Sequence, residues 1–324
     1  MKFAVGLLCS AVLLSAQSGM DLLNHNLPMV DAHNCYPYEG RWIDRLDRAL
    51  SAGTPVGIEQ DLAWDGTQPV LSHSRELKGG EPTLRAYFLE HVRPFVEKAL
   101  REDQRANWPL LTVHFDFKDN RPELHRALWN LLGEYEAWIT TAVKTADPNK
   151  LSPFEVKPLL VLTEDNDAQE DVFFKDVQVG AKLRLFGSAH TANFPGKSRE
   201  ELTHLAATAA PEELLKENPT NYRRWWNNSW ADVEEGGQRN AGAWTPADDA
   251  RLRALVNHAH KLGFWIRFYT LDGFTQAEDH GWDQGYNFGS REAALLRWEA
   301  AISAGVNLIA TDQYEDVAVT LRGK

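Results

Sequence analysis

The stretch 110–118 reads LLTVHFDFK, and its alternation of apolar and polar side chains is the clearest structural signal in the chain. Successive side chains of a β-strand point to opposite faces, so one face of this strand is entirely apolar. The apolar face carries Leu111, Val113, Phe115 and Phe117. The polar face carries Thr112, His114, Asp116 and Lys118. The pattern predicts a strand that packs its apolar face beneath helices and turns its polar face into the interior of a barrel.

Outward from this strand, short apolar segments alternate with longer segments of helical periodicity. Strands are expected over 29–33, 57–62, 69–73, 110–118, 159–163, 183–186, 222–226, 264–270 and 307–311. Helices are expected over 41–52, 83–100, 122–143, 246–261 and 291–303. Thr245 is expected to cap the helix that starts at 246, and Gly263 and Gly305 to end helices in a left-handed conformation. About eight strand–helix units without a linker predict a single-domain α/β fold, a (β/α)8 TIM barrel over 19–324.

Composition excludes several classes of protein. The 324 residues contain 34 Lys+Arg and 46 Asp+Glu, which gives a net charge of −12. Such a charge argues against a nucleic-acid partner and against docking on anionic lipid, and we expect no stable insertion into a membrane. Two cysteines cannot form a disulfide framework or a thiolate metal site.

The first 18 residues, MKFAVGLLCSAVLLSAQS, have the pattern of a secretory signal peptide. Lys2 supplies the positive charge, an apolar run follows, and small residues come next. A run of about a dozen apolar residues is too short to span a bilayer as a helix, which disfavours the alternative of a membrane anchor. We therefore expect a secreted or periplasmic protein.

Carboxylates and histidines gather at the predicted strand ends. Glu59 and Asp61 share one face of the strand at 57–62, and their Cα atoms would lie roughly 6–7 Å apart. This spacing lets both bind one hard cation, and without a cation they would repel each other. His33 ends the first strand and His73 the third. Either histidine alone could be structural, but the set together favours an active site.

Two histidines beside the oxygen ligands Glu59, Asp61 and Asp116 suit cleavage of a phosphodiester with one divalent cation, Mg²⁺ or Ca²⁺. One histidine can act as nucleophile or general base, and the other can protonate the leaving alkoxide. Lys118 can add positive charge at a phosphoryl oxygen, although a structural ion pair with Asp116 is the alternative. Phosphate-loop, dinucleotide-binding and nucleophile-elbow motifs are absent from the sequence.

Three segments resemble the phosphatidylinositol-phospholipase-C-like phosphodiesterase superfamily, nearest its glycerophosphodiester phosphodiesterase and sphingomyelinase D branches. They are MVDAHN, GIEQDLAWDGTQPVLSHS and AGVNLIATDQYEDV, and the resemblance extends over about 28–75, 109–119 and 264–316. It implies a TIM barrel in which His33 and His73 are the catalytic pair. It also implies that Glu59 and Asp61 bind the metal.

The same resemblance makes Asp116 the third metal carboxylate and Lys118 the lysine that faces the phosphate. The chain departs from the glycerophosphodiester branch at Asn34 and Cys35, where that branch has Arg and Gly after the first histidine. It also has Ser74 where that branch has Asp, and it lacks the Pro-Glu-Asn-Thr segment. These departures weaken the expectation of a glycerophosphodiester substrate more than that of phosphodiester cleavage.

Substrate-binding residues are expected from three places. Asn34 could orient a phosphate oxygen beside His33, and Arg267 and Tyr269 share one face of the strand at 264–270. Trp226 lies in a segment rich in Trp, Arg and Asn, which could bind a polar headgroup. The alternative for that segment is a strand that packs its Trp side chains beneath helices.

These observations predict an exported, metal-dependent phosphoric diester hydrolase that acts on a small-molecule or lipid-headgroup phosphodiester. A phosphodiester lyase that releases a cyclic phosphate would use the same groups. A non-catalytic barrel that binds carbohydrate or lipid headgroups is the alternative from another class.

Overall fold

The computed structural model describes residues 27–37, 42–278 and 284–323. The predicted signal peptide at 1–18 lies outside these residues. Within them, no helix combines the length and the apolar character needed to span a bilayer.

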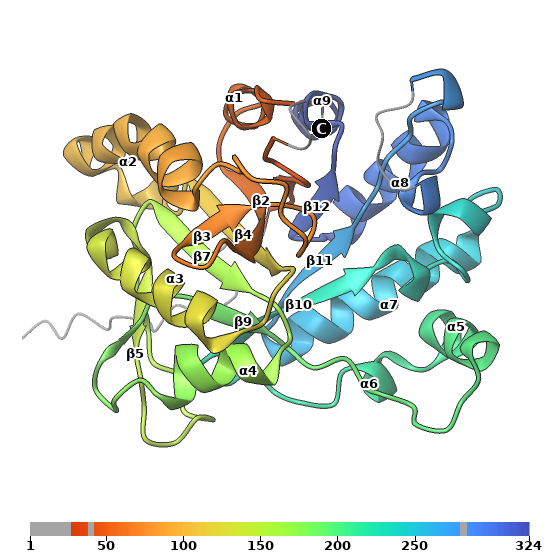
Figure 1. Ribbon diagram of the computed structural model, residues 1–324. Helices are drawn as coiled ribbons and strands as arrows, with labels where there is room; N and C mark the ends of the chain where they lie inside the picture. The colour runs from red at the N-terminus through yellow and green to blue at the C-terminus, as the bar shows by residue number, and fades with distance from the viewer. Residues whose placement is uncertain (1–26, 38–41, 279–283, 324) are drawn as a thin grey trace, which may run out of the picture.

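Eight parallel strands form a closed barrel at the centre of the molecule (Figure 1). In chain order they are β1 (Met29–Ala32), β2 (Val56–Trp64), β4 (Leu111–Phe117), β7 (Leu159–Thr163), β9 (Phe186–Ser188), β10 (Arg223–Ser229), β11 (Trp265–Tyr269) and β12 (Leu308–Thr311). The barrel closes because β1 pairs in parallel with both β2 and β12. The predicted (β/α)8 TIM barrel is confirmed.

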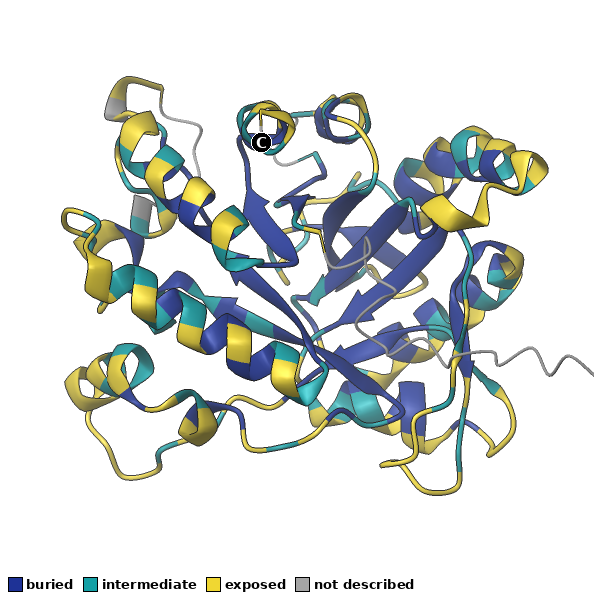
Figure 2. Cartoon of the chain, turned by 180° about the vertical axis from the view of Figure 1, so that it is seen from behind, coloured by how far each residue is buried: buried dark blue, intermediate teal, exposed yellow. Residues whose placement is uncertain are grey.

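Helices surround the strands, and most of them present a buried stripe to the barrel and an exposed stripe to solvent (Figure 2). They are α1 (Arg45–Ser51), α2 (Glu90–Glu102), α3 (Pro122–Glu134), α4 (Asp167–Glu170), α5 (Arg199–Thr208), α6 (Pro211–Leu214), α7 (Pro246–Leu262), α8 (Arg291–Ala304) and α9 (Tyr314–Arg322). The start of α7 and the ends of α7 and α8 lie where the capping residue and the glycines predicted them. The Thr245 side chain accepts a hydrogen bond from the Asp248 amide, and Gly263 and Gly305 have φ values of 98° and 85°.

The strand expected at 69–73 is not part of the barrel wall. In the structure β3 (Pro69–Leu71) pairs antiparallel with β2 as the second strand of a hairpin. Four residues separate β2 from β3, and Asp65 closes the turn by accepting hydrogen bonds from the Thr67 and Gln68 amides. Such a connection is too short for the crossover that a parallel strand needs. His73 therefore lies in the loop after a hairpin.

Two other expectations are corrected. The helix expected over 122–143 stops at the end of α3, and β5 (Thr141–Val143) joins a small antiparallel sheet with β6 (Phe154–Glu155) and β8 (Lys182–Leu183). The single strand expected over 183–186 is divided between β8 and β9. Helical and strand patterns of a few apolar residues are hard to tell apart, which explains why the expected helix was extended into β5.

The register of β2 against β4 positions polar groups inside the barrel. Glu59 lies beside His114, and Asp61 beside Asp116. Gly57, lower on β2, faces Asp31 of β1, and a Cβ atom at that position would lie 2.4 Å from Asp31 Oδ1. Glycine is therefore required for a carboxylate to fit inside the barrel at this level.

Candidate active site

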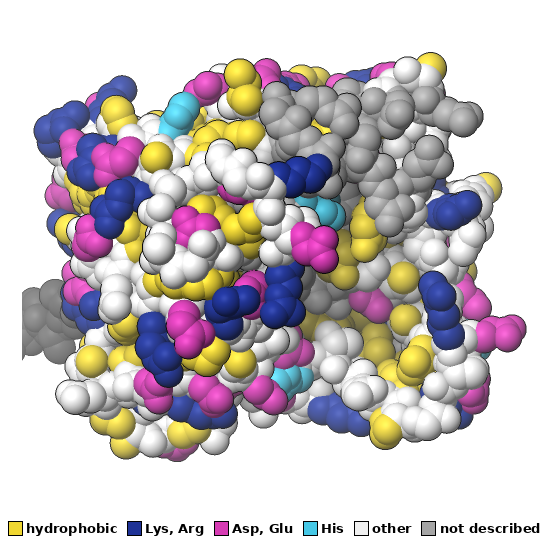
Figure 3. Space-filling view, viewed as in Figure 1, with side chains coloured by type: hydrophobic (Ala, Val, Ile, Leu, Met, Phe, Trp, Pro, Cys, Tyr) yellow, Lys and Arg dark blue, Asp and Glu magenta, His cyan; other side chains and the backbone are white. Residues whose placement is uncertain are grey.

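A cavity of about 530 Å³ opens at the end of the barrel where the parallel strands finish. Catalytic residues of TIM barrels come from this end of the strands. The cavity is lined by polar side chains from most of the strands: His33, Asn34, Glu59, His73, Asp116, Lys118, Glu164, Asn227, Arg267, Tyr269, Thr270 and Asp272. Charged side chains of both signs are interspersed over this side of the molecule (Figure 3).

The structure brings the three predicted carboxylates together. One oxygen atom from each of Glu59, Asp61 and Asp116 lies within 4.8 Å of the others. Asp61 is fully buried, and its Oδ2 atom accepts a hydrogen bond of 2.6 Å from the Tyr36 hydroxyl. Its Oδ1 atom is buried without a hydrogen-bond partner among the described residues. Burial and the neighbouring Asp116 raise the pKa of Asp61 to about 7.

Two basic side chains compensate the negative charge of these carboxylates. The Lys118 ammonium lies 2.8 Å from Asp61 Oδ2 and 2.7 Å from Asp116 Oδ2. The Arg267 guanidinium donates a hydrogen bond of 2.6 Å to Glu59 Oε2 and another to Asp31. Burial disfavours the charged form of Glu59, but the positive charges of His33 and Arg267 outweigh it and hold the pKa of Glu59 well below its usual range.

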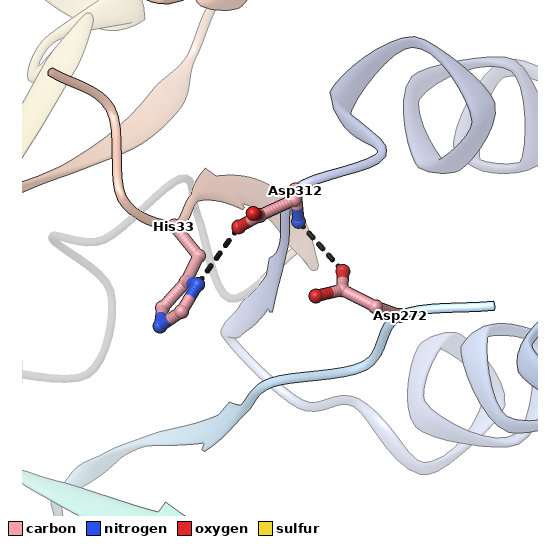
Figure 4. A group of neighbouring side chains, drawn as sticks. All are labelled: His33, Asp272 and Asp312. Atoms are coloured by element: carbon pink, nitrogen blue, oxygen red, sulfur yellow. Dashed lines mark hydrogen bonds and ion pairs between the residues drawn. The ribbon is translucent and has the colours of Figure 1, made fainter. Parts of the chain in front are cut away.

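A chain of carboxylates orients His33 (Figure 4). Its Nδ1 atom lies 2.8 Å from Asp312 Oδ1, and its Nε2 atom lies 3.1 Å from Thr270 Oγ1 and 3.7 Å from Glu59 Oε2. Arg45 binds the other oxygen of Asp312 at 3.0 Å, and Asp272 accepts a hydrogen bond from the Asp312 amide. Burial works against a charged imidazole, yet the carboxylates of Glu59 and Asp312 raise the pKa of His33 to about 9.

His73 borders the same cavity from the loop after β3. Desolvation lowers its pKa, and the positive charges of Lys118 and His33 lower it further. The pKa values of the two histidines are therefore shifted in opposite directions. Near neutral pH His33 is protonated and His73 is neutral. Paired groups with separated pKa values are typical of an acid and a base in one site.

Sequence reasoning missed Asp272 and Glu164, which line the cavity, and Asp312, which pairs with His33 beside it. Asp312 and Asp272 follow β12 and β11, and Glu164 follows β7. Glu164 bonds to His114, and the Asn227 amide lies 3.3 Å from both of its carboxylate oxygens. An acidic residue directly after a predicted apolar strand was the available signal, and it marks Asp312 and Glu164.

The structure places the predicted substrate-binding residues unequally. Asn34 and Tyr269 line the cavity. Arg267 also lines it, but its guanidinium is engaged by Asp31, Glu59 and Asn227. Trp226 is buried away from the cavity, and its indole donates a hydrogen bond of 2.9 Å to Thr191 Oγ1. Trp226 was wrongly assigned because the neighbouring residues of β10 point to opposite faces, and Asn227 is the one that faces the cavity.

Comparisons with known proteins give little guidance. No family model and no curated protein matches the chain. Similar solved structures include wild-type Plasmodium falciparum HPPK-DHPS with STZ-DHP, at 11% identity and a TM-score of 0.45 over 93% of this chain and 47% of that one. A triple mutant of the P. falciparum protein with SDX-DHP has 9% identity and a TM-score of 0.46, with the same coverage. This chain therefore spans about half the length of those chains.

These findings correct the predicted membership in the phosphatidylinositol-phospholipase-C-like superfamily. No family model supports it, and the similar solved structures are those of a different protein. The TM-scores of 0.45 and 0.46 are also too low for those structures to indicate the chemistry of this chain. The roles of the cavity residues therefore rest on their geometry alone.

Proposed function

We propose that this protein hydrolyses phosphodiesters of the glycerophosphodiester or phospholipid-headgroup type, with one divalent cation and with acid–base catalysis by two histidines. The supporting observation is that His33 and His73 border one cavity together with Glu59, Asp116 and Lys118. Two imidazoles, oxygen ligands for a hard cation and an ammonium group can together catalyse phosphoryl transfer to water.

The carboxylates fit a hard cation such as Mg²⁺ or Ca²⁺. Oxygen atoms on opposite sides of such an ion are about 4–5 Å apart, which matches the separation within Glu59, Asp61 and Asp116. The buried Asp61 Oδ1 atom, which has no hydrogen-bond partner among the described residues, is available as a ligand. A bound divalent cation would neutralise the non-bridging oxygens of the phosphoryl group.

His33 is assigned as the general acid. Asp312 accepts the hydrogen bond of the Nδ1–H group and so places the other proton of the imidazolium on Nε2, at the cavity. That proton passes to the leaving alkoxide as its bond to phosphorus breaks.

His73 is assigned as the general base. Its neutral imidazole takes a proton from the attacking water as the new bond between oxygen and phosphorus forms. The products are an alcohol and a phosphomonoester, and transfer of a proton from His73 to His33 through solvent restores the starting state.

Hydrolysis of bis(p-nitrophenyl) phosphate by the purified protein tests this proposal. We expect EDTA to abolish turnover and Mg²⁺, Ca²⁺ or Mn²⁺ to restore it. His33→Ala and His73→Ala should each remove at least about 100-fold of the activity. The matched control is His204→Ala, because His204 is exposed on α5 and pairs with Glu235.

Retained turnover in either histidine variant would refute the two-histidine mechanism. Phosphorus NMR of the product separates hydrolysis from the lyase reaction, since a cyclic phosphate has a distinct shift. A protein with no turnover and no cation binding by calorimetry would instead be the non-catalytic barrel.

A further inference from the structure

The Lys118 ammonium lies between two of the carboxylates that would bind the cation. It contacts Asp61 Oδ2 and Asp116 Oδ2 at 2.8 and 2.7 Å. Asp61 Oδ2 also accepts a hydrogen bond from the Tyr36 hydroxyl, so this oxygen already has two donors. The lysine therefore compensates the same negative charges that a divalent cation would compensate.

A divalent cation and the ammonium cannot both occupy this place. A cation bound to Asp61 and Asp116 would lie within about 4 Å of Lys118 Nζ, where two positive centres repel each other strongly. The same two carboxylates would also have to compensate both positive groups. Binding of the cation therefore requires Lys118 to move.

Lys118 has room to move, and the other basic group does not. The Lys118 side chain is 20% exposed and borders the cavity, whereas that of Arg267 is 2% exposed. Arg267 is also fixed by Asp31, Glu59 and Asn227. The flexible stem of a lysine allows its charge to turn from the carboxylates into the cavity.

We propose that Lys118 is a tethered cation that occupies the metal site when the site is empty and is displaced into the cavity when a divalent cation binds. This inference deepens the proposed function and rests on its metal site. The displaced ammonium then adds its charge beside His73, where an anionic substrate enters. Binding of the cation and binding of an anion thus become positively coupled.

Calorimetric titration of Ca²⁺ and Mg²⁺ into the metal-free protein tests the competition. Lys118→Met keeps the length of the side chain and removes its charge. We expect Lys118→Met to bind the cation roughly tenfold or more tightly than the wild type. Lys175→Met is the control, because Lys175 forms an exposed ion pair with Asp171 and should leave the affinity unchanged.

Inorganic phosphate provides the second probe. In the wild type, saturating Ca²⁺ should tighten phosphate binding through both the cation and the displaced ammonium, and in Lys118→Met the gain should be smaller because only the cation contributes. Equal or weaker cation affinity in Lys118→Met, or an unchanged gain in phosphate affinity, would overturn the inference.

Reductive methylation of the wild type, followed by mass spectrometry, tests the movement without any substitution. Lys118 should react several-fold faster with Ca²⁺ than without it, because its amino group is released from two carboxylates into the open cavity and is then accessible to the reagent. Lys144, whose ammonium binds the carbonyl oxygens of Phe174, Lys175 and Val177, should react equally under both conditions. A Lys118 rate that is independent of Ca²⁺ would contradict the proposal.

The two proposals fail in different ways. If Lys118→Met bound the cation more tightly than the wild type, and the wild type turned over no diester, the tethered cation would be supported and the hydrolase refuted. Metal-dependent turnover by the wild type, with equal cation affinity in the wild type and Lys118→Met, would support the hydrolase and refute the tethered cation. No cation binding to either protein would overturn the inference together with the metal dependence of the proposed function.

Discussion

Asp312 is the residue on which the orientation of His33 depends. One of its oxygen atoms lies 2.8 Å from the imidazole Nδ1 atom, and the other accepts a hydrogen bond from Arg45. An anion held in this way fixes both the tautomer and the charge of the histidine. Asp312 does not line the cavity, so we regard it as a positioning residue.

We expect Asp312→Asn to lower the pKa of His33 toward its ordinary value, since the carboxylate of Asp312 helps to raise it to about 9. Activity that needs protonated His33 is lost as the pH rises through this pKa, so the alkaline limb of the pH–rate profile should move to lower pH. At about pH 8 the variant should be roughly tenfold slower than the wild type. An unmoved alkaline limb would show that Asp312 serves only the fold.

At the scale of the elements, the two-residue period of β4 was predictable because one face of that strand is wholly apolar. β10 offers no such contrast, since its sequence RRWWNNS has large aromatic and polar residues on both faces. In the structure Trp225 faces the barrel interior, where it contacts His114, and Trp226 faces outward. The sequence pattern could not distinguish these two orientations. Residues in loops after strands, such as Asp272, carry no periodic signal, so only the fold could place them.

His125 on α3 makes the packing of that helix sensitive to pH. It lies in an aromatic cluster, with ring centroids 5.0 Å from Phe117 and 5.4 Å from Phe173. Burial lowers the pKa of His125 to about 4. The folded protein therefore resists protonation of His125, and the stability that depends on its neutral form is complete above about pH 6.5 and is lost as the pH falls toward 4.

Urea denaturation at about pH 7.5 and pH 4.5 measures this effect. The free energy of unfolding of the wild type should fall by about 2 kcal/mol more than that of His125→Phe over this interval. Because the carboxylates that titrate in this range are common to both proteins, their contribution cancels in the difference. Parallel losses in the two proteins would mean that His125 is protonated without cost to the fold.

At the scale of the whole molecule, the closed barrel gathers residues that are far apart in sequence. The (β/α)8 fold and the carboxylate cluster followed from strand spacing and parity. The hairpin position of β3 was missed because the apolar pattern of 69–73 alone does not give the pairing direction, although a connection of four residues to β2 is too short for a parallel crossover. The missed pairing of His114 with Glu164 likewise needs the adjacency of β4 and β7.

A cation that binds only the folded barrel should stabilise the entire molecule. At about a hundredfold excess over its dissociation constant, Ca²⁺ or Mg²⁺ should add about 3 kcal/mol and raise the melting temperature by roughly 5 °C. Asp61→Asn should abolish this shift, because it removes the most buried of the three carboxylates. Scanning calorimetry with EDTA and with added cation gives the measurement, and an equal shift in Asp61→Asn would place the cation elsewhere.

The pairing of β1 with β12 also sets a condition on when the protein can act. His33 and its partner Asp312 are separated by 279 positions along the chain and meet only where the first and last barrel strands lie side by side. A ribosome makes His33 well before Asp312, because 279 positions separate them. A growing chain therefore carries the histidine long before anything can orient it, and the site is completed only after translation of the last strand.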